Sequence, residues 1–377
     1  MDRKIRVLHV LSGMDRAGTE NLLMSLYRNI NRDKIQFDFA VSAERKCAFD
    51  DEIIDLGGKI YHYPRYRGYN HLSYIKWWND FFSQHNEHYI IHGHIGSTAA
   101  IYLSIAKKYG RFAVAHSHNT NPKLSITSVL YRVYSYRTRF IADYFFGCSK
   151  QALIDRYGKK IANDEQKSSV LNNAIDTEKF VFDPQIREQI RNELHINTDE
   201  VIIGTVGRLS QQKNPYIIIE IVNELKKRGK TFRFLWTGTG ELENEIKKKI
   251  HSLNIDNLFI FTGVRSDINR ILMGMDIFIF PSLWEGLGIS YVEAQASGLP
   301  ALCSNAVSLD GKVSDNVKYL PLNDIEEWCN EINYQISVIK PNLGQRSLAY
   351  LQVINAGFDI KDTTRRIEQF YFDKLIK

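Results

Sequence analysis

Short apolar runs alternate with stretches of helical pattern along the whole chain, and the alternation occurs in two successive series. The strand-like runs of the first series extend from residues 6–13 to 169–175, and those of the second from 201–207 to 317–322. Helical stretches such as 72–84 lie between them. Because alternating strands and helices form parallel sheets with helices on both faces, the pattern predicts an α/β fold with two doubly wound parallel sheets.

A polar stretch between the two series indicates where one domain ends and the next begins. A chain of 377 residues is longer than a single core usually supports, which favours two domains. Residues 178–198 are polar and precede a new strand, so we expect a Rossmann-like domain over 1–185 and another over 186–354. A basic and aromatic helix is expected over about 355–377. Ligands of such sheets bind at the carboxyl ends of the strands.

Composition narrows the class of protein. With 44% hydrophobic and 24% charged residues, the chain has the balance of a soluble globular protein. Neither a signal peptide nor a membrane span is expected, and four widely spaced cysteines without a CxxC pair favour the cytoplasm. A net charge of +6 suits an anionic ligand or an anionic membrane surface, and a nucleic-acid partner is not expected.

The segment 281–300, PSLWEGLGISYVEAQASGLP, carries the most specific signal in the chain. An apolar run precedes it, so the order is strand, glycine-containing loop and helix, with Glu285 in the loop and Glu293 in the helix. The unpaired N–H groups and the dipole at a helix start favour an anion. Carboxylates accept hydrogen bonds from hydroxyl pairs, which suits the two sugars of a nucleotide-sugar diphosphate. The alternative is an amphipathic helix with ordinary solvated acids.

A second charged loop follows the strand at 201–207. Arg208 and Lys213 lie five positions apart, and Asn214 with Pro215 is typical of a helix start, with Asn as the cap and Pro at the first position. Two cations beside a helix N-terminus would neutralise a diphosphate without a metal ion. The alternative is a pair of solvated surface cations.

The first domain offers a glycine-containing loop and a histidine pair. Gly13 and Gly18 follow the first strand and allow close backbone approach, but they do not form the GxGxxG fingerprint of nicotinamide or flavin binding. His116 and His118 lie two positions apart at the end of a strand and therefore face the same way. They could form a metal pair, although no nearby Cys, Asp or Glu completes the ligand set, or they could be hydrogen-bonded structural residues. His92 and His94 are expected to line a cleft at most.

Segment 122–140 combines basic residues with aromatic ones and contains no acid. Arg132 and Arg137 are among its cations, and Tyr136 and Phe140 among its aromatic residues. Such a composition predicts contact with an anionic lipid surface or a lipid diphosphate. A solvated cationic helix packed by its tyrosines is the alternative.

Together, the string at 281–300 and GRLSQQKNP after the strand at 201–207 resemble the signatures of the family-4 retaining glycosyltransferases of the GT-B fold. Leu287 replaces the usual aromatic residue and Gln295 the common Met, while Ala17 stands where a glycine is frequent. The opening VLHVLSGMDRAGTE and the string VAHSHNT are most similar to bacterial capsular and exopolysaccharide members.

The resemblance implies specific roles for residues of this chain. The candidate catalytic residues are His118, near the anomeric carbon of the donor, together with Glu285, Arg208 and Lys213, and His116 is held in reserve. The donor-binding residues implied are Arg208, Lys213, Val264, Glu285, Gly286, Leu287, Gly288 and Glu293, with Gly13 and Gly18 in the acceptor or phosphate loop. The terminal helix is implied to pack back on the first domain.

The predicted activity is therefore retaining transfer of a sugar from a nucleotide-diphosphate donor, expected to be a UDP-sugar, to a saccharide acceptor on a lipid diphosphate. Neither a metal nor another cofactor is expected. The expected location is the cytoplasm, with contact at the inner face of the cell membrane as a further expectation. Two alternatives remain at this stage, a non-hydrolysing nucleotide-sugar epimerase and a non-catalytic nucleotide-sugar-binding protein of the same fold.

Overall fold

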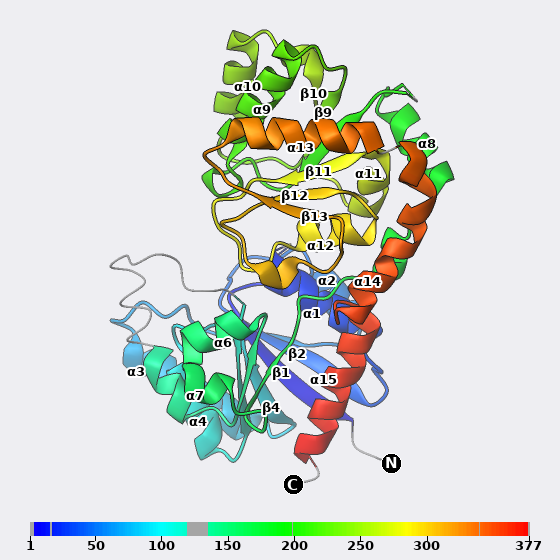
Figure 1. The fold of residues 1–377 in the computed structure, drawn as a ribbon. Coiled ribbons are helices and arrows are strands. Elements are labelled where there is room, and N and C mark those ends of the chain that lie inside the picture. Colours follow the sequence, from blue (N-terminus) through cyan, green and yellow to red (C-terminus); the bar gives the residue numbers. More distant parts are fainter. Residues whose placement is uncertain (1–3, 16, 119–134, 198, 339, 376–377) are drawn as a thin grey trace. The chain divides into compact units, whose positions relative to one another are not determined.

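The computed structural model describes residues 4–15, 17–118, 135–197, 199–338 and 340–375, and it divides the chain into two compact units (Figure 1). Unit 1 comprises the residues up to Ala174 together with those from Ile360 onwards, and unit 2 runs from Ile175 to Asp359. Each unit contains a parallel sheet with helices on both faces, which confirms the predicted α/β class.

Unit 1 is built on a seven-stranded parallel sheet in the order β3-β2-β1-β4-β5-β6-β7. Its strands are β1 (Ile5–Leu11), β2 (Ile35–Val41), β3 (Ile60–His62), β4 (His88–Gly93), β5 (Phe112–Ser117), β6 (Tyr144–Gly147) and β7 (Ser168–Val170). Its helices are α1 (Gly18–Asn29), α2 (Asp50–Asp55), α3 (His71–Gln84), α4 (Ala99–Lys108), η1 (Arg137–Phe140), α6 (Lys150–Tyr157), α7 (Lys159–Ala162) and α15 (Ile360–Leu375).

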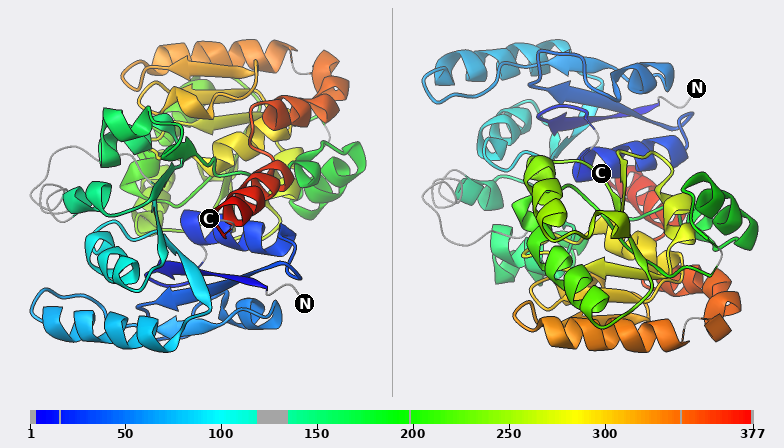
Figure 2. Two further views of the ribbon diagram at one scale, coloured as in Figure 1. Left: turned by 90° about the horizontal axis from the view of Figure 1, so that it is seen from below. Right: turned by 90° about the horizontal axis from the view of Figure 1, so that it is seen from above.

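Both faces of this sheet are apolar because its central strands are buried on both sides. Helices α1, α2 and α15 cover one face, where Leu26, Ile53 and Tyr371 join the core, and α3, α4 and α6 cover the other. Helix α15 returns to unit 1 after the chain has passed through unit 2, and it lies beside α1 (Figure 2). Phe370 of α15 packs on the ring of Tyr144, at a centroid distance of 4.6 Å.

Unit 2 contains a six-stranded parallel sheet in the order β10-β9-β8-β11-β12-β13. Its strands are β8 (Ile202–Val206), β9 (Arg233–Thr237), β10 (Phe259–Gly263), β11 (Ile277–Phe280), β12 (Ala301–Ser304) and β13 (Val317–Leu320). Its helices are η2 (Thr177–Phe180), α8 (Pro184–Glu193), η3 (Gln211–Lys213), α9 (Pro215–Lys227), α10 (Glu243–Ser252), η4 (Asp256–Leu258), α11 (Ile268–Gly274), α12 (Ile289–Ala296), η5 (Leu309–Gly311), α13 (Ile325–Val338), η6 (Lys340–Leu348) and α14 (Ala349–Asn355).

The units divide at Ala174–Ile175 instead of at the expected 185–186. The difference has a packing cause, because Phe180 and Ile190 are buried in the core of unit 2. The guanidinium of Arg187 donates to the carbonyl of Met275, at 2.9 Å, within the same unit. Sequence polarity suggested a linker at this point, whereas the apolar side of the stretch belongs to the second core.

Candidate functional site

The strand order of unit 2 reverses between β8 and β11, which are neighbours in the sheet although β9 and β10 lie between them in sequence. At such a switch point the loops after the two strands diverge and leave room for a ligand at the carboxyl edge. Here the two loops are 207–214 and 281–288, which are the segments that carry the predicted donor-binding charges. The topology therefore brings together two motifs that are separated by about seventy residues of sequence.

The loop 207–214 is held in place by the neighbouring loop after β9. Leu209 N–H donates to the carbonyl of Thr239 at 3.1 Å, and Leu242 N–H donates back to the carbonyl of Leu209 at 3.0 Å. A Cβ on Gly238 would lie 2.2 Å from the carbonyl oxygen of Gly207, so only glycine permits this approach. The glycine turn after β9 thus serves to support the charged loop.

Lys213 and Glu285 form an ion pair across the two loops, with Lys213 Nζ 2.7 Å from Glu285 Oε1. Their side chains are 18% and 8% exposed, and the Lys213 ammonium also lies 4.4 Å from the centroid of the Phe280 ring. The backbone carbonyl of Gln212 accepts a hydrogen bond from the N–H of Leu283 at 2.9 Å, which connects the two loops. An anionic ligand could compete with Glu285 for this ammonium, because the pair is not completely enclosed.

The remaining donor-site candidates differ in their exposure. Arg208 is exposed at the start of its loop, and Val264 is exposed in the loop that follows β10. Leu287 is buried, with its side chain in the core of unit 2, so that only its backbone is left for a ligand. Gly288 has φ of +80°, and a Cβ there would lie 2.8 Å from the ring of Phe280. The loop before α12 therefore requires glycine at 288 for its path.

Helix α12 begins at Ile289, after the loop that the sequence predicted. Glu293 is a partly buried residue in this helix, and burial raises the pKa of its carboxyl to about 7. Near neutral pH the carboxyl is therefore poised between its acid and its carboxylate forms. Ionisation would give it the two acceptor oxygens that a ribose hydroxyl pair requires.

Two details of the motifs have structural explanations. Asn214 was expected to cap α9 with its side chain, but it makes no such hydrogen bond and adopts a left-handed conformation with φ of +51°. The short helix η3 ends at this residue and sets that backbone, while Pro215 takes the first helical position as predicted. Gln295, which stands where Met is common in the family, accepts from the N–H groups of Val313 and Ser314 at 2.9 and 3.0 Å.

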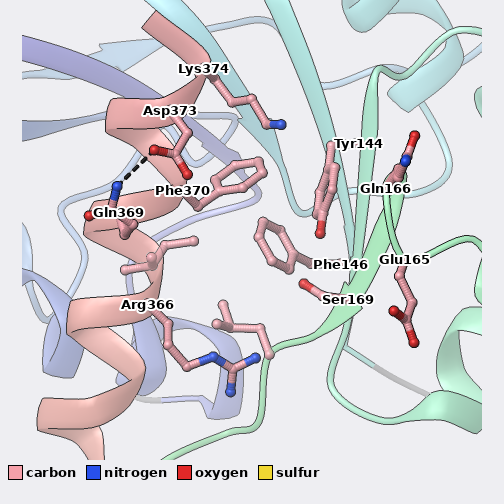
Figure 3. Close-up of a pocket in the computed structure, with 12 residues that line it drawn as sticks. Tyr144, Phe146, Glu165, Gln166, Ser169, Arg366, Gln369, Phe370, Asp373 and Lys374 are labelled. Carbon is pink, nitrogen blue, oxygen red and sulfur yellow. Dashed lines mark hydrogen bonds between the residues drawn. The ribbon is translucent and has the colours of Figure 1, made fainter. Parts of the chain in front are cut away.

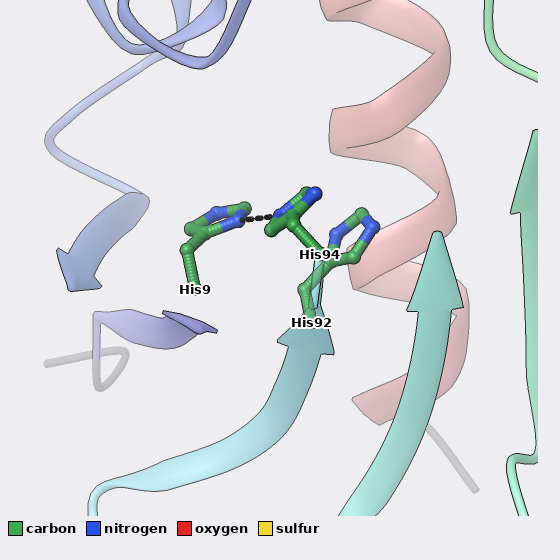
Figure 4. Close-up of side chains that lie close together, drawn as sticks. All are labelled: His9, His92 and His94. Atoms are coloured by element: carbon green, nitrogen blue, oxygen red, sulfur yellow. Dashed lines mark hydrogen bonds between the residues drawn. The ribbon is translucent and has the colours of Figure 1, made fainter. Parts of the chain in front are cut away.

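Unit 1 has its own switch point between β1 and β4, and histidines gather there. His9 lies on β1, His92 on β4 with His94 directly after it, and His116 and His118 at the end of β5. His94 is the centre of a chain of imidazoles, because its Nε2 lies 3.0 Å from His9 Nδ1 and its Nδ1 lies 2.7 Å from His118 Nε2. Figure 4 shows His9, His92 and His94 side by side, and the His92–His94 rings stack with centroids 4.5 Å apart.

These histidines are held in the neutral form by their surroundings. Burial lowers the pKa of His9 and of His118 to about 3. Burial lowers the pKa of His92, His94 and His116 well below the usual value as well, and neighbouring imidazoles add to the effect. The sequence predicts His116 and His118 as a pair, whereas His9 was not predicted and His92 and His94 were expected only to line a cleft. The available signal was a histidine near the carboxyl end of three successive central strands.

The glycine loop after β1 lies near the same edge. Gly13 is buried, and a Cβ there would lie 3.1 Å from Cys47 Sγ. Gly18 is the first residue of α1, and an added Cβ would meet no atom within 4 Å. Space is therefore available at the start of α1, where the role in acceptor or phosphate binding stays a prediction.

A separate pocket in unit 1 contains none of the predicted site residues (Figure 3). It lies between α15 and the strands β6 and β7, and its cations have partners within the fold. Arg366 donates to the carbonyl of Val170 at 3.1 Å, and the Lys374 ammonium lies 5.5 Å from the ring centroid of Tyr144. We therefore place the candidate chemistry at the two switch points.

The predicted basic and aromatic segment is described only in part. Lys123, Tyr131, Arg132 and Tyr134 lie outside the described residues. Tyr136 and Phe140 are 51% and 74% exposed, and the Arg139 guanidinium lies 4.1 Å from the ring centroid of Tyr136. Among the described residues, the helices are too short or too polar to cross a bilayer.

The chain is similar in sequence to a known family and to individual known proteins. The family described as "Glycosyl transferases group 1" matches residues 186–336. The chain is 32% identical over 306 residues to the putative glycosyltransferase EpsF of Bacillus subtilis, a match that covers 80% of each chain. It is 29% identical over 231 residues to an Escherichia coli UDP-Gal:alpha-D-GlcNAc-diphosphoundecaprenol alpha-1,3-galactosyltransferase, covering 58% of this chain and 57% of that protein.

Solved structures agree on the fold. Anabaena HepE in complex with UDP has a TM-score of 0.80 at 18% identity, over 98% of this chain and 100% of that one. A glycosyltransferase from Rickettsia africae has a TM-score of 0.82 at 18% identity, over 99% of both chains. These likenesses, together with the EpsF match, confirm the predicted GT-B fold and the predicted family.

Proposed function

Because the chain belongs to the group 1 glycosyl transferases, we propose that it transfers a sugar from a UDP-sugar, with retention of configuration, to a saccharide carried on a lipid diphosphate. The observation that carries the proposal is the meeting of loops 207–214 and 281–288 at the switch point of unit 2, with Lys213 paired to Glu285. Six donor-site candidates lie on these two loops, namely Arg208, Lys213, Glu285, Gly286, Leu287 and Gly288.

Support for the donor and acceptor comes from the relatives. Anabaena HepE has been solved with UDP and with UDP-glucose, and the Escherichia coli relative is named for a UDP-galactose donor and a diphosphoundecaprenol-linked acceptor. EpsF and the amylovoran biosynthesis glycosyltransferase AmsK of Erwinia amylovora support a role in exopolysaccharide synthesis. We extend these donor and acceptor classes to this chain as part of the proposal.

The first step proposed is an exchange of ion-pair partners on donor binding. The ammonium of Lys213 pairs with the β-phosphate of the donor in place of Glu285, and Arg208 contributes a second positive charge from the same loop. Glu285 is then free to accept hydrogen bonds from hydroxyls of the donor sugar, while Glu293 holds the ribose. Charge builds up on the diphosphate as it leaves, and positioned donors of this kind each contribute about 10²–10³ in rate. The proposed departure therefore needs no metal ion.

The proposed route for retention is attack on the same face from which the diphosphate leaves. The departing phosphate oxygen takes the proton of the acceptor hydroxyl, so that the bond to the acceptor forms as the bond to phosphate breaks. Retaining enzymes of the two-carboxylate type use a nucleophilic carboxylate instead. Glu285 is assigned here to hydroxyls of the donor sugar and not to its anomeric carbon, which favours the same-face route. His118 is proposed to position the donor sugar in the transfer step.

A transfer assay with a matched pair of variants tests this function. Purified protein is given labelled UDP-sugars and a polyprenyl-diphosphate saccharide, and products are analysed for linkage and anomeric configuration. We expect Glu285→Gln to lower turnover by about 10²-fold, because the sugar loses a charged acceptor. Glu243→Gln, in the first turn of α10, serves as the control, because Glu243 also pairs with a lysine, Lys247, at 2.7 Å. An altered nucleotide sugar formed without acceptor would point instead to an epimerase, and an inverted product would contradict retention.

We also propose that the protein acts in the cytoplasm at the membrane surface and that segment 122–140 contacts the membrane. The described part of this segment is 135–140, in which Tyr136, Arg137 and Phe140 are exposed. Replacing Arg137 and Arg139 with Glu is expected to reduce sedimentation with anionic vesicles, by about 1 kcal/mol of binding free energy for each residue. Equal sedimentation of the variant would remove this part of the proposal.

A further inference from the structure

Three of the clustered histidines in unit 1 are close enough to hold one ion together. His94, His116 and His118 each offer a ring nitrogen, and the three atoms lie within 4.8 Å of one another. His116 is buried, whereas His94 and His118 keep part of their surface exposed. An ion therefore has a way in through these two residues.

Unpaired nitrogens in the cluster point to a missing ligand. Both ring nitrogens of His116 and Nδ1 of His118 are buried without a hydrogen-bond partner in the described part of the chain. Buried polar atoms nearly always find a partner, and an exception calls for an ion or a water molecule. A cation bound through one ring nitrogen of His116 would satisfy that nitrogen, which has no hydrogen-bond partner among the described residues.

The protonation state of the cluster also suits a metal ion. A metal binds the neutral imidazole, and burial holds all three histidines in that form. His94 can ligate through Nδ1 while its Nε2–H donates to Nδ1 of His9, which lies 3.0 Å away. A second hydrogen bond of this kind is what orients metal-binding histidines in general. Binding then needs a shift of protons within the chain of imidazoles and no net proton loss.

We propose that His94, His116 and His118 form a binding site for a divalent transition metal ion, with Zn²⁺ as the best fit. Three imidazoles match the nitrogen ligands that zinc prefers, whereas Mg²⁺ and Ca²⁺ prefer oxygen ligands. The nitrogens of His94 and His118 would have to separate from 2.7 Å to about 3.3 Å, the spacing that tetrahedral zinc–nitrogen bonds impose. Rotation of the partly exposed His118 ring supplies this movement.

A second histidine group in unit 1 is a natural comparison. His85, Glu87 and His88 also lie within reach of one another. Their atoms are already engaged, since His88 Nε2 lies 2.7 Å from Asp38 Oδ2 and His85 Nδ1 lies 3.1 Å from Glu87 Oε1. We therefore do not assign an ion to this group, and His85 provides the control position.

The site has a consequence for the proposed function without depending on it. An ion on His118 would engage the side chain that is proposed to position the donor sugar, so Zn²⁺ is expected to inhibit transfer while the transfer itself needs no metal. Metal binding is measured in the absence of any nucleotide. Failure of the metal site would therefore leave the donor proposal intact, and failure of the donor proposal would leave the metal site intact.

The test is titration of the tag-free, chelator-treated full chain with Zn²⁺ and with Co²⁺. We expect one equivalent of Zn²⁺ per chain and a Co²⁺ absorption spectrum of tetrahedral type, which reports ligation in the wild-type protein without any variant. His116→Gln is expected to weaken binding by more than about tenfold. His85→Gln is expected to bind as the wild type does.

Circular dichroism and thermal unfolding check that both variants are folded. If His116→Gln does not fold, His94→Gln takes its place, and the wild-type cobalt spectrum still decides. An absence of stoichiometric binding by the wild type would overturn the proposal. Equal loss of binding in both variants would also overturn it, and so would unchanged binding in folded His116→Gln. The cluster would then be a chain of hydrogen-bonded imidazoles without an ion.

Discussion

The two sheets of this protein share a plan but differ in what they place at the same position. In each sheet the strand order reverses at the centre, between β1 and β4 in unit 1 and between β8 and β11 in unit 2. Unit 2 places an ammonium and a carboxylate there, whereas unit 1 places neutral imidazoles. A shared topology thus supplies the location for a ligand, and the side chains at its edge decide the chemistry.

The largest expected effect is at the charged switch point. Lys213→Met removes the ammonium that is proposed to receive the leaving diphosphate, and we expect the transfer rate to fall by about 10²–10³-fold. Lys247→Met is the matched control, because Lys247 is 49% exposed, pairs with its helix neighbour Glu243 and, like Lys213, lies near an aromatic ring, 5.2 Å from the centroid of Phe261. Steady-state kinetics with both variants measures the difference. A rate for Lys213→Met close to that of the control would contradict the assignment.

The second largest expected effect is a pH dependence of stability that comes from Glu293, in the helix that follows the switch point of unit 2. The folded pKa of Glu293 is about 7, above the ordinary value of 4.5, so the folded state holds its proton more tightly. The free energy of unfolding should therefore be highest below pH 4.5 as far as this residue is concerned, and should fall as the pH rises to about 7. The contribution amounts to about 3 kcal/mol.

Glu293→Gln should abolish this part of the pH dependence, because glutamine does not ionise. Urea unfolding of both proteins between pH 5 and pH 8, about the range over which the shift acts, measures the effect. We expect the free energy of unfolding of the variant to increase relative to that of the wild type as the pH rises. Parallel curves for the two proteins would show that the carboxyl is not desolvated in solution.

The smallest expected effect belongs to unit 1. Tyr371→Phe removes the hydrogen bond between Tyr371 and Nδ1 of His92, which is 2.8 Å long and buried. We expect a loss of about 1–2 kcal/mol in the free energy of unfolding. Tyr216→Phe, whose exposed hydroxyl contacts Glu245, should cost much less. UDP affinity should be unchanged in both, and a weakened affinity in Tyr371→Phe would mean that the two switch points are coupled.

Much of this organisation can be predicted from the sequence, because it depends on local patterns. The alternating apolar runs predict both sheets, and the segment 281–300 with the apolar run before it predicts strand, loop and helix in their observed order. The pairing of Lys213 with Glu285 could not be predicted, since it depends on β8 and β11 being neighbours in the sheet. The side-chain cap at Asn214 was predicted wrongly, because a turn of 3₁₀-helix ends there and sets a left-handed backbone.

The histidine cluster shows the same limit. The spacing of His116 and His118 is visible within one strand, and it was interpreted as a possible pair. The contacts of His94 with His9 and with His118 cross three strands that are far apart in sequence. Only the sheet order β1-β4-β5 brings them together. Contacts between residues on neighbouring strands are therefore the part of a site that sequence patterns do not predict.

The most direct test of the account is whether the switch point of unit 2 binds a nucleotide diphosphate. The measurement is the thermal unfolding of wild-type protein and Lys213→Met with UDP, in the presence of a chelator and then of Mg²⁺. We predict that UDP stabilises the wild type equally under both conditions, by about 2.7 kcal/mol at a hundredfold excess over Kd, and that Lys213→Met loses most of this gain. No stabilisation of the wild type, or stabilisation only with Mg²⁺, would contradict the account.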